Sequence, residues 1–358
     1  MKAAVLYGPN KLAVEEIQVE EPKAGEVLVK MAAAGVCHSD LHFIEGLWPY
    51  PAPFVMGHEG AGVVERVGPG VTLVAPGDHV ILSWVAPCGL CRDCAAGRPY
   101  ICKTGPVATM KDGTTRFYKG DQRIFHQTGV SSFAEYAVVH ETAAIRIRTD
   151  APLDRAALIG CGVMTGVGAV INTANVEVGA SVAVLGCGGV GLNVVQGAVL
   201  AGAIKIIAVD TLDNKLEMAK NLGATHTVNA SSEDPVARIR EITDGGADYA
   251  FEVIGLPDVV AQAFEAIATS GTAVMVGMPP LGSNIVINSV PLFMGKTLKG
   301  ALYGSARVRV DMPMLVDLYM AGKLKLDELV SRSYPIDQIS EAFEVMKKGE
   351  VARSIIKF

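Results

Sequence analysis

One segment of the chain combines a predicted strand, a glycine-rich turn and a predicted helix in unbroken succession. The run VAVLGCGGVGLNVVQGAVLAG (182–202) places Gly186, Gly188 and Gly191 in GxGxxG register. The first glycine permits a tight turn, the second lets the backbone approach a pyrophosphate, and the third lets the helix pack on the strand. An isolated GxGxxG is often a simple turn, but this context predicts a phosphate site at a helix N-terminus.

An acidic residue ends the next predicted strand. The run KIIAVD closes with Asp210, nineteen positions after Gly191, where a carboxylate can accept hydrogen bonds from both hydroxyls of an adenosine ribose. Its negative charge would repel a 2′-phosphate, so NAD is expected rather than NADP. A solvated helix cap is the alternative for Asp210 alone. Strand, glycines and acid together predict dinucleotide binding.

The chain changes its pattern at about Ser181. Beyond it, apolar runs such as SVAVLG, KIIAVD, DYAFEVIG and TAVMVG alternate with helices predicted at 214–222 and 259–268. This alternation predicts an α/β domain with a doubly wound parallel sheet. Residues 1–160 instead show short apolar alternations broken by Gly, Pro and Asp, which predicts a β-rich domain. A helix at 312–321 and a strand at 354–358 are expected near the C-terminus.

Length and charge restrict the classes of function. The chain has 358 residues, enough for two domains that each bury a core. Its net charge of −6 argues against nucleic acid or an anionic membrane as a partner. Lys11, Glu15 and Glu16 interrupt the apolar residues of the N-terminal segment, so no signal-peptide core is expected. We therefore expect a cytoplasmic protein, in which free thiols persist.

Four of the seven cysteines lie in one fifteen-residue run with the spacing CxxCxxCx7C. They are Cys88, Cys91, Cys94 and Cys102. Thiolates at such separations bind Zn²⁺ tetrahedrally, so the run predicts a closed, structural zinc site. A disulfide pair and an iron–sulfur cluster are the alternatives. Cys102 is followed by Lys103 rather than proline, which disfavours the cluster.

Three scattered residues form a second candidate metal site. Cys37 lies in AGVCHSDLH, His58 in MGHEGAG and Cys161 in IGCGVMTG. Two thiolates and one imidazole would leave one tetrahedral position open, which is the arrangement of a catalytic zinc. Each residue alone is equally compatible with ordinary packing. The spacing by itself leaves both interpretations open.

The order of these motifs resembles that of a known family. CHSDLH, GHEGAGVVERVG, CxxCxxCx7C and GCGGVG follow one another as in the zinc-dependent medium-chain alcohol dehydrogenases, and the segment 112–136 is similar to one in their liver-type branch. The resemblance covers essentially the whole chain. It implies a GroES-like catalytic domain at 1–162 and 303–358, a Rossmann domain at 163–302, two zinc ions per chain, NAD, and a homodimer, with a homotetramer as the alternative.

The resemblance also implies roles for individual residues. Cys37, His58 and Cys161 would bind the catalytic zinc, with Glu59 behind it and Asp40 orienting His58. Ser39 would hydrogen-bond the substrate hydroxyl, and His42 would receive its proton through the nicotinamide ribose. The implied cofactor-binding residues are His38, Thr165, Gly186, Gly188, Gly189, Val190, Gly191, Asp210, Lys215, Val253 and Arg353.

The resemblance implies specific contacts for four of these cofactor residues. His38 stands where many relatives carry an arginine, so weaker dinucleotide binding and faster release are expected. Arg353 would contact the cofactor pyrophosphate. Thr165 and Val190 would press against the nicotinamide ring, with ordinary packing as their alternative.

The implied reaction is the reversible oxidation of primary alcohols to aldehydes by hydride transfer to NAD. Trp48, Trp84, Met278 and Leu302 fall at positions that line the substrate channel in relatives. Bulky walls predict short to medium chains, while stacking keeps aromatic alcohols possible. An aryl alcohol dehydrogenase, or a nicotinoprotein that retains its cofactor, is the alternative. Glutathione-dependent formaldehyde dehydrogenases carry acidic residues where this chain has 46–48, so their activity is not expected here.

Two rival classes fit the sequence less well. A zinc-free quinone reductase of the same superfamily would lack both cysteine sets. A zinc-ribbon module that grips nucleic acid or protein predicts a basic surface, which the net charge opposes. The seventh cysteine, Cys187, is interpreted as a small residue that fits the glycine turn.

Overall fold

The computed structural model describes all 358 residues, and these divide into two compact units. Unit 1 comprises Met1–Gly162 and Arg307–Phe358, and unit 2 comprises Val163–Ala306. The chain returns from unit 2 to unit 1 at Arg307, four residues after the boundary that the sequence predicts at 303. The reason is that the turn at 302–305 packs within unit 2, where Ser305 Oγ lies 2.8 Å from Thr173 Oγ1.

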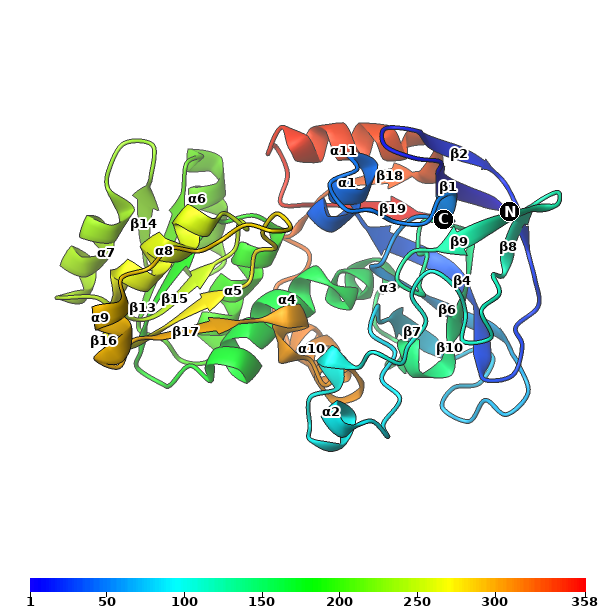
Figure 1. Cartoon of the computed structure of the whole chain (residues 1–358), viewed down its shortest axis with the longest axis horizontal. Coiled ribbons are helices and arrows are strands. Elements are labelled where there is room, and N and C mark those ends of the chain that lie inside the picture. Colours follow the sequence, from blue (N-terminus) through cyan, green and yellow to red (C-terminus); the bar gives the residue numbers. More distant parts are fainter. The chain divides into compact units, whose positions relative to one another are not determined.

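Unit 1 is rich in β-structure, as expected (Figure 1). One sheet has the order β2-β1-β5-β9-β8-β3, and the other has the order β11-β7-β6-β4-β19-β18 with β10 also paired to β4. The first sheet contains β1 (Lys2–Leu6), β2 (Leu12–Glu16), β3 (Gln18–Val19), β5 (Phe54–Val55), β8 (Phe117–Lys119) and β9 (Gln122–His126). The second contains β4 (Glu26–Gly35), β6 (Gly60–Val67), β7 (His79–Leu82), β10 (Tyr136–His140), β11 (Ala144–Arg146), β18 (Val330–Pro335) and β19 (Arg353–Lys357).

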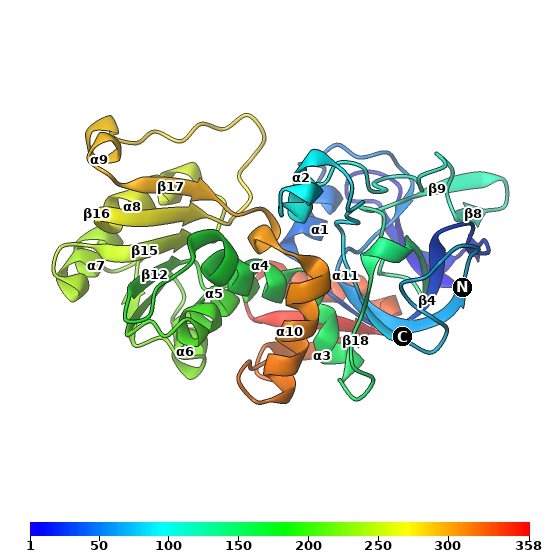
Figure 2. The ribbon, with the colours of Figure 1, turned by 90° about the horizontal axis from the view of Figure 1, so that it is seen from below.

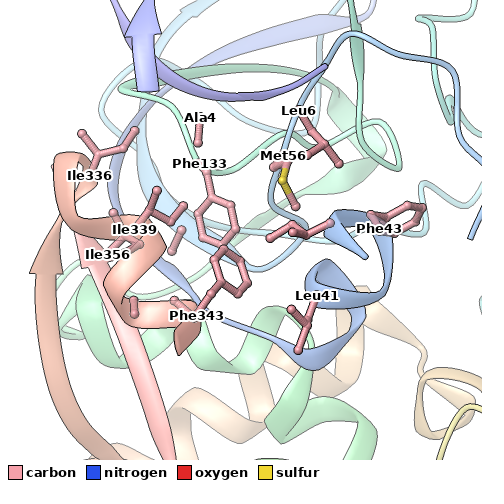
Figure 3. Close-up of a cluster of buried hydrophobic side chains, with 14 of the residues drawn as sticks. Ala4, Leu6, Leu41, Phe43, Met56, Phe133, Ile336, Ile339, Phe343 and Ile356 are labelled. Atoms are coloured by element: carbon pink, nitrogen blue, oxygen red, sulfur yellow. The ribbon is translucent and has the colours of Figure 1, made fainter. Parts of the chain in front are cut away.

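The helices of unit 1 come from both ends of its sequence. They are α1 (His38–Ile44), α2 (Arg92–Ala95), α3 (Leu153–Ala156), α10 (Val308–Met320) and α11 (Ile339–Lys347). Figure 3 shows a buried cluster in which Phe133 and Phe343 face one another, with ring centroids 6.1 Å apart in an edge-on contact. Leu41 and Phe43 of α1 belong to the same cluster. The core therefore fixes α1, which carries several candidate site residues.

Unit 2 contains one parallel sheet with the order β14-β13-β12-β15-β16-β17. Its strands are β12 (Ser181–Leu185), β13 (Lys205–Asp210), β14 (His226–Asn229), β15 (Ala247–Glu252), β16 (Ile267–Met275) and β17 (Thr297–Gly300). Its helices are α4 (Gly162–Gly168), α5 (Gly189–Leu200), α6 (Asp213–Asn221), α7 (Pro235–Thr243), α8 (Pro257–Ala266) and α9 (Ser289–Phe293). The strand order reverses between β12 and β15, which is where doubly wound folds bind dinucleotides.

The predicted helices occur, with shifted ends. Most shifts are of one or two residues, but α10 begins at Val308, four residues before its predicted start. The Asp311 carboxylate accepts hydrogen bonds from the backbone N–H and the guanidinium of Arg307, both at 2.7 Å. This local pairing stabilises a first turn that apolar periodicity does not reveal.

No individual helix has the length and apolar composition needed to cross a membrane. The consecutive helical segments Leu153–Gly160 and Gly162–Ala174 meet these criteria only when taken together as a bent pair.

Candidate metal centre and dinucleotide site

The structure brings the three scattered ligands together in unit 1. Cys37 directly precedes α1, His58 lies between β5 and β6, and Cys161 follows a helical turn at 157–160. All three are buried, and their ligand atoms lie within 4.8 Å of one another. Sheet pairing brings Cys37 and His58 together, because β4 places Ala34 opposite Gly60 of β6, three residues from Cys37 and two from His58. Gly160, next to Cys161, packs on the same strand β6, where an added Cβ would lie 3.3 Å from the Gly60 nitrogen.

The imidazole of His58 is oriented for a metal. Its Nδ1 lies 2.8 Å from Asp40 Oδ1, and its Nε2 is buried without a hydrogen-bond partner. A buried nitrogen without a partner is costly unless something fills the position. The thiols of Cys37 and Cys161 lie close to this nitrogen. The Asp40 carboxylate accepts from Nδ1 and so fixes the tautomer in which Nε2 is free to coordinate a metal. These residues fit a zinc ion with three protein ligands and one open position.

Each of the three ligands shifts the pKa of at least one other. The hydrogen bond from Cys161 holds the pKa of Cys37 well below its ordinary value, and it raises the pKa of Cys161. Burial alone would lower the pKa of His58, but Asp40 and Cys37 together raise it well above its usual range. A metal needs deprotonated thiols and a neutral imidazole, so its binding to this set would release protons.

A buried ion pair lies beside the same residues. The Arg353 guanidinium of β19 contacts the Glu59 carboxylate, and both side chains are almost completely buried. Burial raises the pKa of Glu59 to about 7, with Arg353 limiting the rise. The Gly162 N–H donates to Glu59 at 3.2 Å. Arg353 therefore forms an ion pair with Glu59 in this structure. The sequence predicted a contact with the cofactor pyrophosphate and did not predict this pair.

Helix α1 carries the remaining predicted catalytic residues. Ser39 and His42 are three residues apart and so share one face of the helix. Nδ1 of His42 is buried without a partner, and its ring lies 5.9 Å from the Trp48 ring at a tilt of 30°. Asp40 is buried on the same helix, and His38 is exposed.

The four clustered cysteines form a separate centre in unit 1. Their sulfur atoms all lie within 4.8 Å of one another, and none of the seven cysteines is in a disulfide. Backbone N–H groups point at these sulfurs, including Cys91 N to Cys88 Sγ at 3.3 Å and Cys88 N to Cys102 Sγ at 3.4 Å. Hydrogen bonds from Thr104 and the backbone lower the pKa of Cys88 to about 6. Four convergent sulfurs with this support fit a closed zinc site.

The glycine loop of unit 2 has the shape of a phosphate cradle. Gly186 has φ +102°, and a Cβ on Gly191 would lie 1.8 Å from the Gly186 carbonyl oxygen, so the close helix–strand packing excludes any side chain there. A Cβ on Gly188 would meet no atom within 4 Å. Gly188 thus borders open space at the start of α5, where a pyrophosphate fits.

Asp210 lies beside this loop at the end of β13. Its Oδ2 accepts the Cys187 N–H at 2.8 Å, and its Oδ1 accepts the N–H groups of Thr211 and Leu212 at 2.8 and 3.1 Å. The carboxylate is therefore held in one orientation, and it is only partly buried. Cys187 is buried, and burial raises the pKa of its thiol to about 12, consistent with a packing role.

The other predicted residues are divided between the units. Trp48 and Trp84 lie in unit 1, where Trp48 packs on Phe43 and Trp84 borders the cluster around Val80 and Leu82. Thr165, Val190, Lys215, Val253, Met278 and Leu302 lie in unit 2. Leu302 is half exposed, and the other five are partly buried.

Comparison with known proteins agrees with this arrangement. The alcohol dehydrogenase GroES-like domain family matches residues 23–149, and the zinc-binding dehydrogenase family matches residues 189–320. An S-(hydroxymethyl)glutathione dehydrogenase from Paracoccus denitrificans is 42% identical over 99% of both chains. This chain belongs to the zinc-dependent medium-chain dehydrogenase/reductase superfamily. Its GroES-like and Rossmann-like domains confirm the fold predicted from the sequence.

Solved structures of other dehydrogenases of this superfamily resemble the chain over its whole length. An alcohol dehydrogenase zinc-binding domain protein from Burkholderia ambifaria is 39% identical with a TM-score of 0.96, covering 100% of this chain and 98% of that one. A benzyl alcohol dehydrogenase from Acinetobacter calcoaceticus is 37% identical with a TM-score of 0.95, covering 100% and 99%.

The sequence interpretation missed one residue at the metal centre. Gln127 is fully buried and lies 2.7 Å from Asp40, although 87 positions separate them in the chain. Its position within a loop after β9 gives no periodic or spacing signal. A buried amide of this kind becomes visible only when its hydrogen-bond partners are located.

Proposed function

We propose that the protein is an NAD-dependent zinc alcohol dehydrogenase that interconverts primary alcohols and aldehydes. The observation that carries this proposal is the buried set of Cys37, His58 and Cys161, with Nε2 of His58 lacking a partner. Three protein ligands leave a fourth position for water or substrate, whereas the four-cysteine centre has none. Two zinc ions per chain follow, one for each centre.

The chain's own residues supply orientation and a proton route. Zinc bound by Cys37, His58 and Cys161 would act as a Lewis acid that lowers the hydroxyl pKa of an alcohol, and NAD would accept the hydride. Ser39 would hydrogen-bond the substrate hydroxyl and accept its proton, and His42, three residues further on the same helix face, would receive the proton through the nicotinamide ribose; its Nδ1 has no partner. Asp40 holds His58 in the tautomer that coordination needs.

The cofactor site supports NAD over NADP. Gly188 leaves room for a pyrophosphate, and the Asp210 carboxylate, which backbone N–H groups hold in one orientation, would accept the hydroxyls of an adenosine ribose. Dialysis of the purified protein, followed by absorbance at the NADH band, distinguishes an exchangeable cofactor from the tightly held cofactor of a nicotinoprotein.

The substrate is a short- to medium-chain primary alcohol in our first proposal. Trp48, whose ring lies 5.9 Å from that of His42 and packs edge-on to Phe43, supplies a bulky aromatic wall near the proposed proton route. The same wall and the likeness to a benzyl alcohol dehydrogenase favour aryl alcohols as the second candidate. The 42% identical relative makes S-(hydroxymethyl)glutathione a third substrate to test.

Steady-state kinetics on ethanol, hexanol, benzyl alcohol and S-(hydroxymethyl)glutathione separates these substrates. The first proposal expects the highest kcat/KM for hexanol or ethanol, and a tenfold preference for benzyl alcohol would replace it with the aryl assignment. Trp48→Ala should lower kcat/KM for benzyl alcohol more than for ethanol. Metal analysis of the same preparation should give two zinc ions per chain, and a protein with one zinc and no NAD turnover would refute the proposed function.

We propose a homodimer formed through the sheet edge of unit 2. Strand β17 has a neighbour on one side only (Figure 2), and exposed apolar side chains lie close to it in sequence. These are Val286, Val290, Leu292, Phe293 and Met294. A second copy could pair with this edge about a two-fold axis and cover these side chains. Light scattering should give a dimeric mass for the unmodified protein and a monomeric mass for Phe293→Asp. A tetrameric mass for the unmodified protein would support a homotetramer instead. We also propose a cytoplasmic location, which the lack of any disulfide among the seven cysteines supports.

A further inference from the structure

The side-chain amide of Gln127 bridges two separate segments at the metal centre. Its Nε2 donates to Asp40 Oδ1 at 2.7 Å, and its Oε1 accepts the Gly57 N–H at 2.6 Å. A flipped amide would face oxygen to carboxylate and N–H to N–H, so these two partners fix its orientation. The residue is fully buried.

Both partners of Gln127 act on His58. Oδ1 of Asp40 also accepts from His58 Nδ1 at 2.8 Å, so one carboxylate oxygen takes up both hydrogen bonds. Gly57 directly precedes His58 in the chain and has φ +97°. A Cβ at Gly57 would lie 2.5 Å from the backbone nitrogen of Phe133, so this segment has little room to move. Gln127 thus restrains the His58 ring through Asp40 and the His58 backbone through Gly57.

The loop that carries Gln127 is itself well anchored. The Gln127 N–H donates to Ser131 Oγ at 3.0 Å, and that hydroxyl donates to the Val55 carbonyl at 3.0 Å. Val55 belongs to β5, the strand that leads to Gly57 and His58. An anchored donor holds its acceptor more closely than a mobile one does.

We propose that Gln127 is a positioning residue for the metal ligand His58. The inference rests on the proposed zinc centre and deepens it. Without the amide, the Gly57 N–H would lose its acceptor and Asp40 would lose one of the two donors to Oδ1, both in a buried region. Asp40 and His58 would then gain freedom to rotate, and the three ligands would hold a metal less tightly.

Two variants and a matched control test this role. Gln127→Leu removes both hydrogen bonds of the amide. Gln127→Glu keeps an oxygen acceptor for the Gly57 N–H but puts a carboxylate oxygen where the NH₂ group donates to Asp40. The control is Tyr50→Phe. The Tyr50 hydroxyl donates to the His126 carbonyl at 2.8 Å and accepts the Thr128 N–H at 3.0 Å. It therefore anchors the loop on either side of Gln127 without contacting Asp40 or Gly57.

The primary measurement is the rate of zinc release to a chromogenic chelator, with thermal midpoints and kcat and KM recorded in parallel. The four-cysteine centre serves as an internal reference. Both Gln127 variants should release zinc from the three-ligand centre about 10-fold faster, the low end of the range for partners of metal ligands. The four-cysteine zinc should be unaffected. Tyr50→Phe should lower the thermal midpoint without accelerating release.

The outcomes separate the inference from the proposed function. If the unmodified protein releases two zinc ions and the Gln127 variants release them at the same rates, the positioning role is refuted and the centre stands. If Tyr50→Phe released zinc as fast as the Gln127 variants, or if zinc left both centres faster, the effect would come from a loosened loop. Either result would also refute the positioning role of Gln127. If the unmodified protein holds a single zinc, the proposed centre fails and the inference fails with it.

Discussion

Replacing Asp210 with asparagine should shift the protein from NAD toward NADP. The carboxylate is partly exposed at the end of β13, and three backbone N–H groups hold it in place. Two unit charges about 4 Å apart interact by about 1 kcal/mol in water. A 2′-phosphate bears about two charges near neutral pH. Removing the Asp210 charge should therefore relieve about 2 kcal/mol of repulsion, or about 30-fold in kcat/KM for NADP.

The same change should weaken NAD use by a smaller factor. A neutral amide still accepts a ribose hydroxyl, but the bond to a charged acceptor is about twice as strong. A loss of about 1 kcal/mol, or about 5-fold, is expected. The NADP/NAD ratio of kcat/KM should thus rise about 150-fold. The substitution also loses one hydrogen bond. If the asparagine oxygen still accepts the N–H groups of Thr211 and Leu212, its NH₂ group faces the Cys187 N–H, which then has no acceptor.

The assay is initial-rate kinetics with both cofactors on one alcohol. Asp213→Asn is the matched control, since Asp213 is an exposed carboxylate three residues further on, at the start of α6, where it accepts from Asn229 at 2.7 Å. It removes the same charge from a position next to the site. An equal shift in both variants would mean that only the general field matters. A shift below 3-fold in Asp210→Asn would show that this carboxylate does not face the ribose.

Three further changes test the stability of unit 1 and its division of roles. Cys88→Ser should lose the four-cysteine zinc and lower the thermal midpoint while folded protein retains kcat; a fully folded variant with two zinc ions and no turnover would contradict this. His126 is buried with a pKa lowered to about 3 by burial and by Arg116, so the unfolded chain binds its proton first as pH falls below 6.5. The free energy of unfolding is therefore unaffected by His126 above pH 6.5 and falls by about 3 kcal/mol between pH 7 and pH 4, as the unfolded chain takes up the proton. Urea unfolding of His126→Gln should show a flatter dependence on pH. Phe133→Ala should cost about 3–5 kcal/mol in unfolding free energy because it empties the core in Figure 3. Phe125→Ala, at the partly buried rim of that core, should cost clearly less, and equal losses would show that the two rings are equivalent.

Local sequence signals predicted the elements that depend on local chemistry. The glycine turn before α5, the acid after β13 and the four clustered cysteines all lie within short segments, so spacing alone brings their functional atoms close together. The βα rhythm predicted the parallel sheet of unit 2 for the same reason. The start of α10 was missed because the pairing of Arg307 with Asp311 determines it rather than apolar periodicity.

Residues far apart in the chain required the structure. For Cys37, His58 and Cys161 the spacing left a zinc centre and ordinary packing equally open until the family resemblance favoured zinc, whereas the tertiary structure brings their ligand atoms within 4.8 Å. Neither the Glu59–Arg353 ion pair, 294 positions apart, nor the Gln127 bridge to Asp40 has any signature in spacing. The sequence by itself therefore determined the fold class, the cysteine-rich centre and the phosphate loop. Tertiary structure alone decided what surrounds His58, because long-range hydrogen bonds between buried groups depend on how the strands pair and not on the order of residues.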